Sequence, residues 1–125
     1  MRILASLAVA LVALLHTGFL VLEMFFWDKP LGRRVFGLTP EASAASRVLA
    51  ANQGLYNGFL AAGLVWGLIL GPAGFGVTVF FLACVVAAGL YGAATAGRSV
   101  FWAQAAPGAL ALALVLAARG IARHG

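Results

Sequence analysis

Four long apolar segments limit what this chain can fold into. They cover about residues 3–27, 47–70, 76–96 and 99–118, and a helix that crosses a bilayer needs about 20 mostly apolar residues. The chain has 125 residues, of which 64% are hydrophobic and only 9% are charged, whereas soluble domains carry roughly 25% charged residues. The segments therefore predict an all-α, membrane-spanning four-helix bundle in a single integral membrane domain, residues 1–125.

Polar breaks separate the segments and predict the order of the helices. Residues 28–39 form a polar loop, and Thr39-Pro40-Glu41 is typical of a helix start, with an N-cap, a proline in the first turn and an acid at the positive end of the dipole. The second helix is therefore expected over residues 40–70. The turns "GPAGFG" (71–76) and "AGRS" (96–99) are so short that consecutive helices must be antiparallel neighbours. The predicted topology is up-down-up-down.

The N-terminus and the basic residues bear on how the chain sits in a membrane. "MRILASLAVALVALL" resembles a signal peptide, but the apolar character continues to Trp27, so we expect a retained first helix. The loops at 28–39 and 96–99 share one side. Basic residues on that side outnumber those on the other by five to three, which favours a cytoplasmic position for these loops.

Polar side chains inside the apolar segments are the candidates for a functional site. His16 and Glu23 are seven residues apart, which places both on one face of the first helix, about 10 Å apart along its axis. The second helix carries four further polar residues on one contiguous face: Asn52, Gln53, Tyr56 and Asn57. Counting inward from the membrane edge predicts that Glu23 faces the first two of these and that His16 faces the last two.

The same count places Tyr91 and Gln104 in the same half of the membrane. The sequence therefore predicts a polar pocket in one leaflet that binds a small amphipathic or lipid-soluble molecule. Its predicted lining residues are His16, Glu23, Asn52, Gln53, Tyr56, Asn57, Tyr91 and Gln104. Four arginines are expected at the headgroup level or entrance of the pocket: Arg33, Arg34, Arg47 and Arg98.

Three other interpretations stay open. Glu23 and His16 are candidate acid–base groups for a membrane enzyme of the isomerase or hydrolase type. The chain could instead be a transporter or an assembly subunit, although a carrier generally needs polar groups in both halves of the membrane and the far half reads as almost wholly apolar. Finally, the polar side chains could serve only to hold helices together.

Metal ions, cofactors and nucleic acids are not expected as ligands. One His and one Glu at this spacing do not form a metal site, and no nucleotide-binding fingerprint is present. The basic residues stand singly or in pairs beside apolar runs, where they meet lipid headgroups, and they form no stripe that could follow a nucleic acid. The expected partner is the lipid bilayer.

Small residues recur every four positions on the second helix. This stripe allows a close approach of another helix, either within the bundle or in a homo-oligomer. Its members are Ala50, Gly54, Gly58 and Ala62.

Three stretches of sequence together resemble a known family. They are "VLEMFFW" (21–27), "GRRVFGL" (32–38) and "LAANQGLYNGFLAAGL" (49–64). Their order and spacing resemble the small bacterial integral-membrane proteins grouped as domain of unknown function 1304 (DUF1304). The resemblance runs over essentially the whole chain and implies a multi-pass protein of the bacterial inner membrane. It implies no reaction, ligand or catalytic residue.

Overall fold

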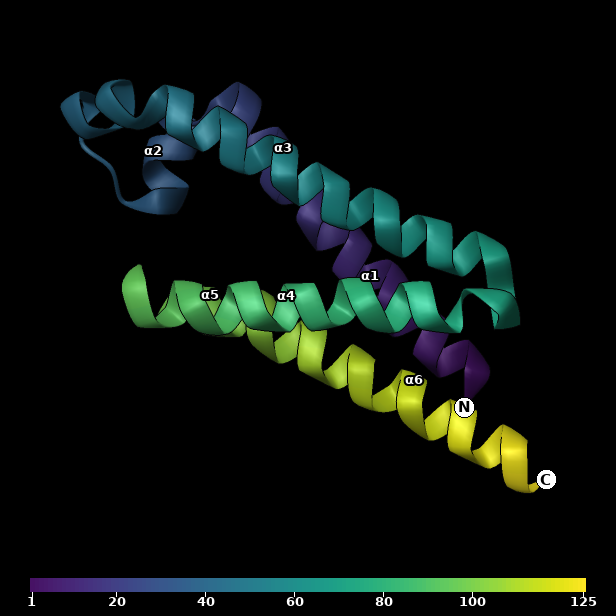
Figure 1. The fold of residues 1–125 in the computed structure, drawn as a ribbon. Coiled ribbons are helices and arrows are strands. Elements are labelled where there is room, and N and C mark those ends of the chain that lie inside the picture. The colour runs from purple at the N-terminus through teal and green to yellow at the C-terminus, as the bar shows by residue number, and fades with distance from the viewer.

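The computed structural model describes residues 1–125 and consists of helices joined by short turns (Figure 1). No strand is present, so the predicted all-α class is confirmed. In chain order the elements are α1 (Arg2–Val21), the π-helix η1 (Leu22–Phe26), α2 (Pro30–Phe36), α3 (Pro40–Leu70), the 3₁₀-helix η2 (Gly71–Gly74), α4 (Phe75–Thr95), α5 (Arg98–Val100), the π-helix η3 (Phe101–Ala105) and α6 (Ala106–His124).

Three continuous helical stretches are long and apolar enough to cross a membrane, judged by length and composition. They are Arg2–Phe26, Pro40–Thr95 and Arg98–His124. The second stretch contains both α3 and α4, which are joined through η2. Many large apolar side chains point away from the protein, and those of Ile3 and Ile69 are 78% exposed. Soluble proteins rarely carry so much exposed apolar surface.

Local sequence signals account for where the helices begin and end. Thr39 caps α3, because its Oγ1 accepts a hydrogen bond from the Ala42 amide at 3.1 Å. Gly71 follows α3 with a φ of 59°, and Gly97 precedes α5 with a φ of 142°. Side chains other than glycine rarely adopt such positive φ values, so these two glycines allow the sharp reversals of the chain.

The helices form two pairs, which Figure 1 shows side by side. α3 packs against α1, and α4 packs against α6; α1 also contacts α6, and α3 also contacts α4. Both chain termini and the η2 turn lie at one end of the molecule, which we call the terminal end (Figure 1). α2 and α5 lie at the opposite end, the loop end, where the α1–α3 pair leans away from the α4–α6 pair.

A small apolar core joins the four long helices. Val12 of α1, Leu64 of α3, Val85 of α4 and Ala111 of α6 are fully buried or nearly so and belong to one contact cluster. Protein interiors are closely packed, and these side chains are of small or moderate size, so the helices must approach one another closely to fill the core. The core therefore needs small residues where two helix backbones approach.

The glycines of the stripe on α3 meet that need inside the chain. A Cβ built on Gly54 would lie 2.8 Å from Met24 Cγ, and one built on Gly58 would overlap the end of the Leu20 side chain. Both glycines therefore face α1. Ala62, the last residue of the stripe, is exposed, so a homo-oligomer through this stripe stays a prediction.

Candidate functional site

Glu23 and Asn57 form a hydrogen bond between η1 and α3. The Asn57 Nδ2 donates to Glu23 Oε1 at 2.8 Å, and Asn57 is buried with 6% of its surface exposed. Gly54 makes the approach possible, because a Cβ at this position would lie 3.0 Å from Glu23 Cβ. The second carboxyl oxygen of Glu23, Oε2, forms no hydrogen bond within the chain.

His16 and Gln104 form a second interhelical hydrogen bond, between α1 and η3. The nitrogen atoms Gln104 Nε2 and His16 Nε2 lie 3.1 Å apart, and His16 is completely buried. His16 Nδ1 lies 2.9 Å from the Val12 carbonyl oxygen, which can only accept, so Nδ1 carries the hydrogen. The network therefore assigns a neutral imidazole whose Nε2 accepts from the Gln104 amide.

Both bonds use a residue from a π-helix. Glu23 lies in η1 and Gln104 lies in η3. A π-turn has one extra residue, which reorients the side chains that it carries, and such turns are frequent at functional sites. For η3 the sequence contains a cause: Pro107 has no amide hydrogen, and its ring would clash with the carbonyl one α-turn earlier. For η1 we find no such signal.

The partners of Glu23 and His16 differ from the predicted ones. Glu23 bonds Asn57, whereas Asn52 and Gln53 were the predicted partners. His16 bonds Gln104 of η3, whereas its predicted partners were Tyr56 and Asn57 of the second helix. Residue numbers rise along α3 as they fall along α1, since Gly54 faces Met24 and Gly58 faces Leu20. Helical side chains tilt toward the N-terminus of their own helix. The side chains of Glu23 and Asn57 therefore lean toward each other along the helix axis. The prediction counted residues from the membrane edge and did not include this tilt.

The other predicted lining residues do not join these two bonds. The Asn52 amide donates to the Val48 carbonyl of its own helix at 2.9 Å, and Gln53 is exposed. Tyr56 and Tyr91 are 54% and 74% exposed. The structure thus brings four of the eight predicted residues together as two bonded pairs and leaves the other four on the outer surface.

At the loop end, a small polar cluster holds the loop between η1 and α3. Ser43 Oγ donates to Asp28 Oδ1 at 2.6 Å, and Arg33 Nη2 donates to the same oxygen at 2.9 Å. These two hydrogen bonds, the Ser43 bond first, hold the pKa of Asp28 below its ordinary value. Trp27 Nε1 also donates to Ser46 Oγ at 2.9 Å. Of the arginines predicted at an entrance, Arg33 is thus bound within the loop.

The remaining three predicted entrance arginines are exposed at the loop end. They are Arg34, Arg47 and Arg98. Sequence reasoning missed Ser43, which is completely buried against the Asp28–Arg33 pair. The predicted helix start at Thr39 could have identified Ser43. A residue four positions after the N-cap lies on the same side of the helix, so its side chain can reach the preceding loop.

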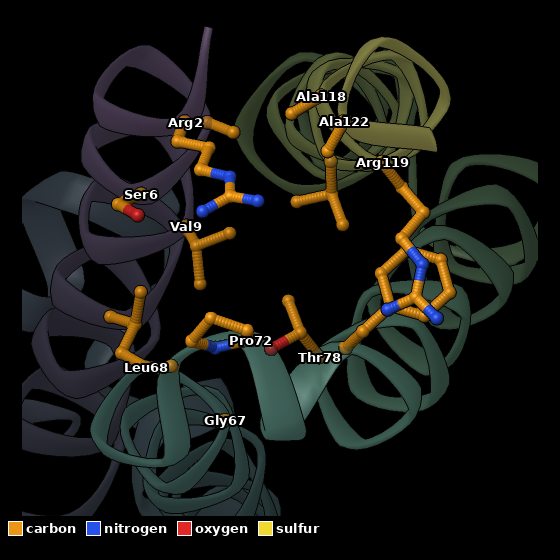
Figure 2. Close-up of a pocket in the computed structure, with 14 residues that line it drawn as sticks. Arg2, Ser6, Val9, Gly67, Leu68, Pro72, Thr78, Ala118, Arg119 and Ala122 are labelled. Atoms are coloured by element: carbon orange, nitrogen blue, oxygen red, sulfur yellow. The ribbon is translucent and has the colours of Figure 1, made fainter. Parts of the chain in front are cut away.

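Sequence reasoning also missed a cavity at the terminal end (Figure 2). This terminal cavity has a volume of about 210 Å³ and lies between α1, η2, the start of α4 and α6. Its lining includes the polar residues Arg2, Ser6, Thr78 and Arg119. The cavity thus brings polar side chains together at the end of the molecule opposite to the predicted pocket.

Comparison with known proteins places the chain in a family. The model of a protein family of unknown function, DUF1304, matches residues 10–116. The chain belongs to this family. It is also 31% identical over 114 residues to the uncharacterized protein YpaA of Lactococcus lactis subsp. lactis (strain IL1403), a match that covers 90% of this chain and 96% of that protein. No solved structure matches the chain.

The range that matches the DUF1304 family contains both interhelical hydrogen bonds. His16, Glu23, Asn57 and Gln104 all lie within residues 10–116, whereas Arg2 and Arg119 of the terminal cavity lie outside. The family resemblance expected from the three sequence stretches is thus confirmed.

Proposed function

We propose that this DUF1304 protein crosses a bacterial inner membrane four times, as an antiparallel up-down-up-down bundle, and binds a small amphipathic molecule in one leaflet. The proposed site consists of the four residues that form the two interhelical hydrogen bonds, His16, Glu23, Asn57 and Gln104, with His16 holding Gln104 in place. The observation that carries the proposal is that Glu23 and Gln104 lie in η1 and η3, next to α2 and α5 in the chain. At this loop end the α1–α3 pair leans away from the α4–α6 pair (Figure 1).

Free hydrogen-bond acceptors at this level indicate the chemistry of the ligand. The Glu23 Oε2, Asn57 Oδ1 and Gln104 Oε1 atoms form no hydrogen bond within the chain. A ligand head that donates hydrogen bonds fits this set. A hydroxyl group fits better than an ammonium group, because the loop-end arginines would repel a cation on its way in.

The shape of the site favours a ligand with an apolar tail. η1 packs against α3 and η3 packs against α4, and the two π-helices belong to different helix pairs. Exposed aromatic side chains lie on the outer surface of the same two π-helices, Phe25 on η1 and Trp102 on η3. A chain of methylene groups would lie along this outer apolar surface, while its hydroxyl head enters between the two helix pairs and reaches Glu23.

Photolabelling tests this proposal. The purified protein in lipid nanodiscs is exposed to a decanol that carries a photoreactive diazirine in its tail, and the labelled residues are mapped by mass spectrometry. We expect labels on η1, η3 and the middle of α3. An excess of dodecanol should suppress these labels, whereas methyl dodecyl ether, which has no donor, should not.

Variants connect the labelling to the acceptor atoms. Replacing Glu23 by Leu removes the free carboxyl oxygen. We expect labelling to fall about tenfold, which corresponds to a loss of roughly 1.4 kcal/mol in the free energy of ligand binding. Glu23→Gln keeps an acceptor and should retain most of the labelling. Asn52→Ala is the matched control, because Asn52 bonds only its own helix. Labels spread evenly over the outer surface, and equal in Glu23→Leu, would end the proposal.

The alternative of a membrane enzyme that uses Glu23 and His16 has less support. Both imidazole nitrogens of His16 are bonded inside the chain, and the Gln104 amide covers Nε2. A substrate would have to displace Gln104 before His16 could accept a proton. For a transporter or an assembly subunit we find no specific supporting contact.

A further inference from the structure

The terminal cavity holds two arginines that form no ion pair. The chain has only three acidic side chains. Asp28 pairs with Arg33, Glu23 bonds Asn57, and Glu41 lies in the first turn of α3 at the loop end. Arg2 and Arg119 therefore bring two positive charges to the terminal cavity without a carboxylate to neutralise them.

The cavity positions these two charges around one space. Figure 2 shows Arg2 on the α1 side and Arg119 on the α6 side, with Val9, Pro72 and Thr78 facing the space between them. The Arg119 guanidinium lies over the Phe75 ring, 4.4 Å from its centroid. This cation–π contact fixes the guanidinium at the rim and leaves its edge free for hydrogen bonds.

Thr78 is another polar residue at this cavity. Thr78 is only 7% exposed, and its side chain lines the cavity. The hydroxyls of Thr17 and Thr95 donate to backbone carbonyls, and that of Thr39 caps α3. That of Thr78 lies against Gly67 of α3, where an added Cβ would overlap it. Thr78 therefore forms part of the cavity wall, and the two arginines are the charged donors that face the space.

We propose that the terminal cavity binds the phosphate head group of an anionic lipid. Two guanidinium groups are donors that suit the oxygens of a phosphate, which arginine binds in a bidentate manner. The inner wall is apolar, with Val9, Leu68 and Val115, and suits the glycerol and first methylene groups of a lipid. Basic pockets between membrane helices are known to bind lipid head groups.

The location of the cavity favours lipid over free phosphate. Arg2 lies at the start of α1 and Arg119 six residues before the end of the chain, at the end of the apolar helices. In the proposed membrane arrangement, lipid phosphates lie at this level. Exposed leucines nearby on α1 and α6, Leu7 and Leu116, offer an apolar surface to acyl chains. The inference rests on the proposed membrane-spanning arrangement but not on the ligand proposed for Glu23 and His16.

Native mass spectrometry of the full chain in mild detergent tests the inference. Phosphatidylglycerol and phosphatidylcholine with the same acyl chains are added separately. We expect a clear preference for phosphatidylglycerol and about a tenfold loss of its binding in Arg2→Gln/Arg119→Gln, because bonds from charged donors are removed. The control Lys29→Gln/Arg123→Gln removes the same charge from two exposed residues that do not line the cavity, and it should bind as the wild type does.

Three results would overturn the inference. They are equal losses in the two double variants, equal binding of the two lipids, and displacement of phosphatidylglycerol by inorganic phosphate in modest excess. The membrane arrangement is checked separately, by washing membranes from expressing cells with alkaline carbonate. A chain released by this wash refutes the membrane arrangement, whereas a retained chain without lipid preference refutes only the inference.

Discussion

His16 Nε2 accepts a hydrogen bond from Gln104 Nε2 at 3.1 Å, and this bond joins α1 to η3 across 88 residues of sequence. It is the polar contact that connects the α1–α3 pair to the α4–α6 pair. Its neighbour, the bond between Glu23 and Asn57, lies wholly within the α1–α3 pair. The two bonds therefore have different roles: one fixes the pairs relative to each other, and the other fixes the register inside one pair.

Replacing Gln104 by Leu should destabilise the fold modestly. The change leaves His16 Nε2 buried without a donor, but interhelical hydrogen bonds in membrane proteins contribute only about 0.6 kcal/mol on average and up to about 1.7 kcal/mol. We expect a loss of about 1 kcal/mol in the free energy of unfolding, measured by titration with a denaturing detergent in mixed micelles. Asn52→Ala is the control, and an equal loss in both variants would show that the His16 bond has no special role.

The positions of the helices could be predicted from the sequence, but the pairing of polar side chains could not. Apolar length and the Thr39-Pro40 signal are local, and α3 begins where they indicate. The partner of Glu23 depends instead on side-chain tilt between two helices, and the partner of His16 depends on a π-turn in a distant segment. Neither can be obtained by counting residues from the membrane edge.

The terminal cavity was missed for a related reason. Arg2 and Arg119 were assigned to the membrane surface by charge alone, and Thr78 lies in a short apolar run that carries no other polar side chain. Only the fold shows that the three residues surround one space, because they come from α1, α4 and α6. The sequence signal that could have indicated this cavity was Thr78, a polar residue in the otherwise apolar first turn of α4.

Gly89 is expected to tolerate no side chain. A Cβ at Gly89 would lie 2.5 Å from the Ala105 nitrogen and 2.7 Å from Ala105 Cα, which are backbone atoms of η3 and cannot move aside. Gly89→Ala should therefore cost about 1–3 kcal/mol in the free energy of unfolding. Gly18→Ala is the matched control, because nothing lies within 4 Å of its Cβ position. That change should be neutral or stabilise by up to about 1 kcal/mol. Equal stability of both variants would contradict the close approach of α4 and η3.

The loop between η1 and α3 should loosen in acid. Hydrogen bonds from Ser43 and Arg33 lower the pKa of Asp28 from its ordinary value of 3.8 in the folded chain. A lowered folded-state pKa means that the ionised carboxylate stabilises the fold above about pH 3.8, and that this contribution is lost as the pH falls further. Limited proteolysis between Asp28 and Pro40 should therefore accelerate in that range.

The acid response should depend on the Asp28 carboxylate itself. Asp28→Asn should be cleaved quickly at every pH and lose most of the acceleration, whereas Glu41→Gln, at the same end of the molecule, should behave as the wild type does. Ser43→Ala should shift the acceleration toward higher pH, because its hydroxyl is the first cause of the lowered pKa. An unchanged profile in Asp28→Asn would show that another group controls the loop.

Pro107 should determine where Gln104 points. Its ring prevents an α-helical turn over residues 103–107, and the chain forms η3 instead, with the Ala106 amide bonded to the Phe101 carbonyl. In Pro107→Ala the turn can become α-helical, which removes the extra residue of the π-turn and rotates Gln104 by up to about 100° relative to α6. The Gln104 amide would then leave His16.

A double-mutant cycle checks the role of Pro107. In the wild-type background, Gln104→Leu should cost about 1 kcal/mol in the free energy of unfolding, and in the Pro107→Ala background it should cost almost nothing, since the bond is already lost. Pro72→Ala, a proline in η2 far from Gln104, is the control background and should leave the cost of Gln104→Leu unchanged. If Gln104→Leu costs the same in all three backgrounds, Pro107 does not position the amide, and the π-turn of η3 must arise from packing of Ala105 against Gly89.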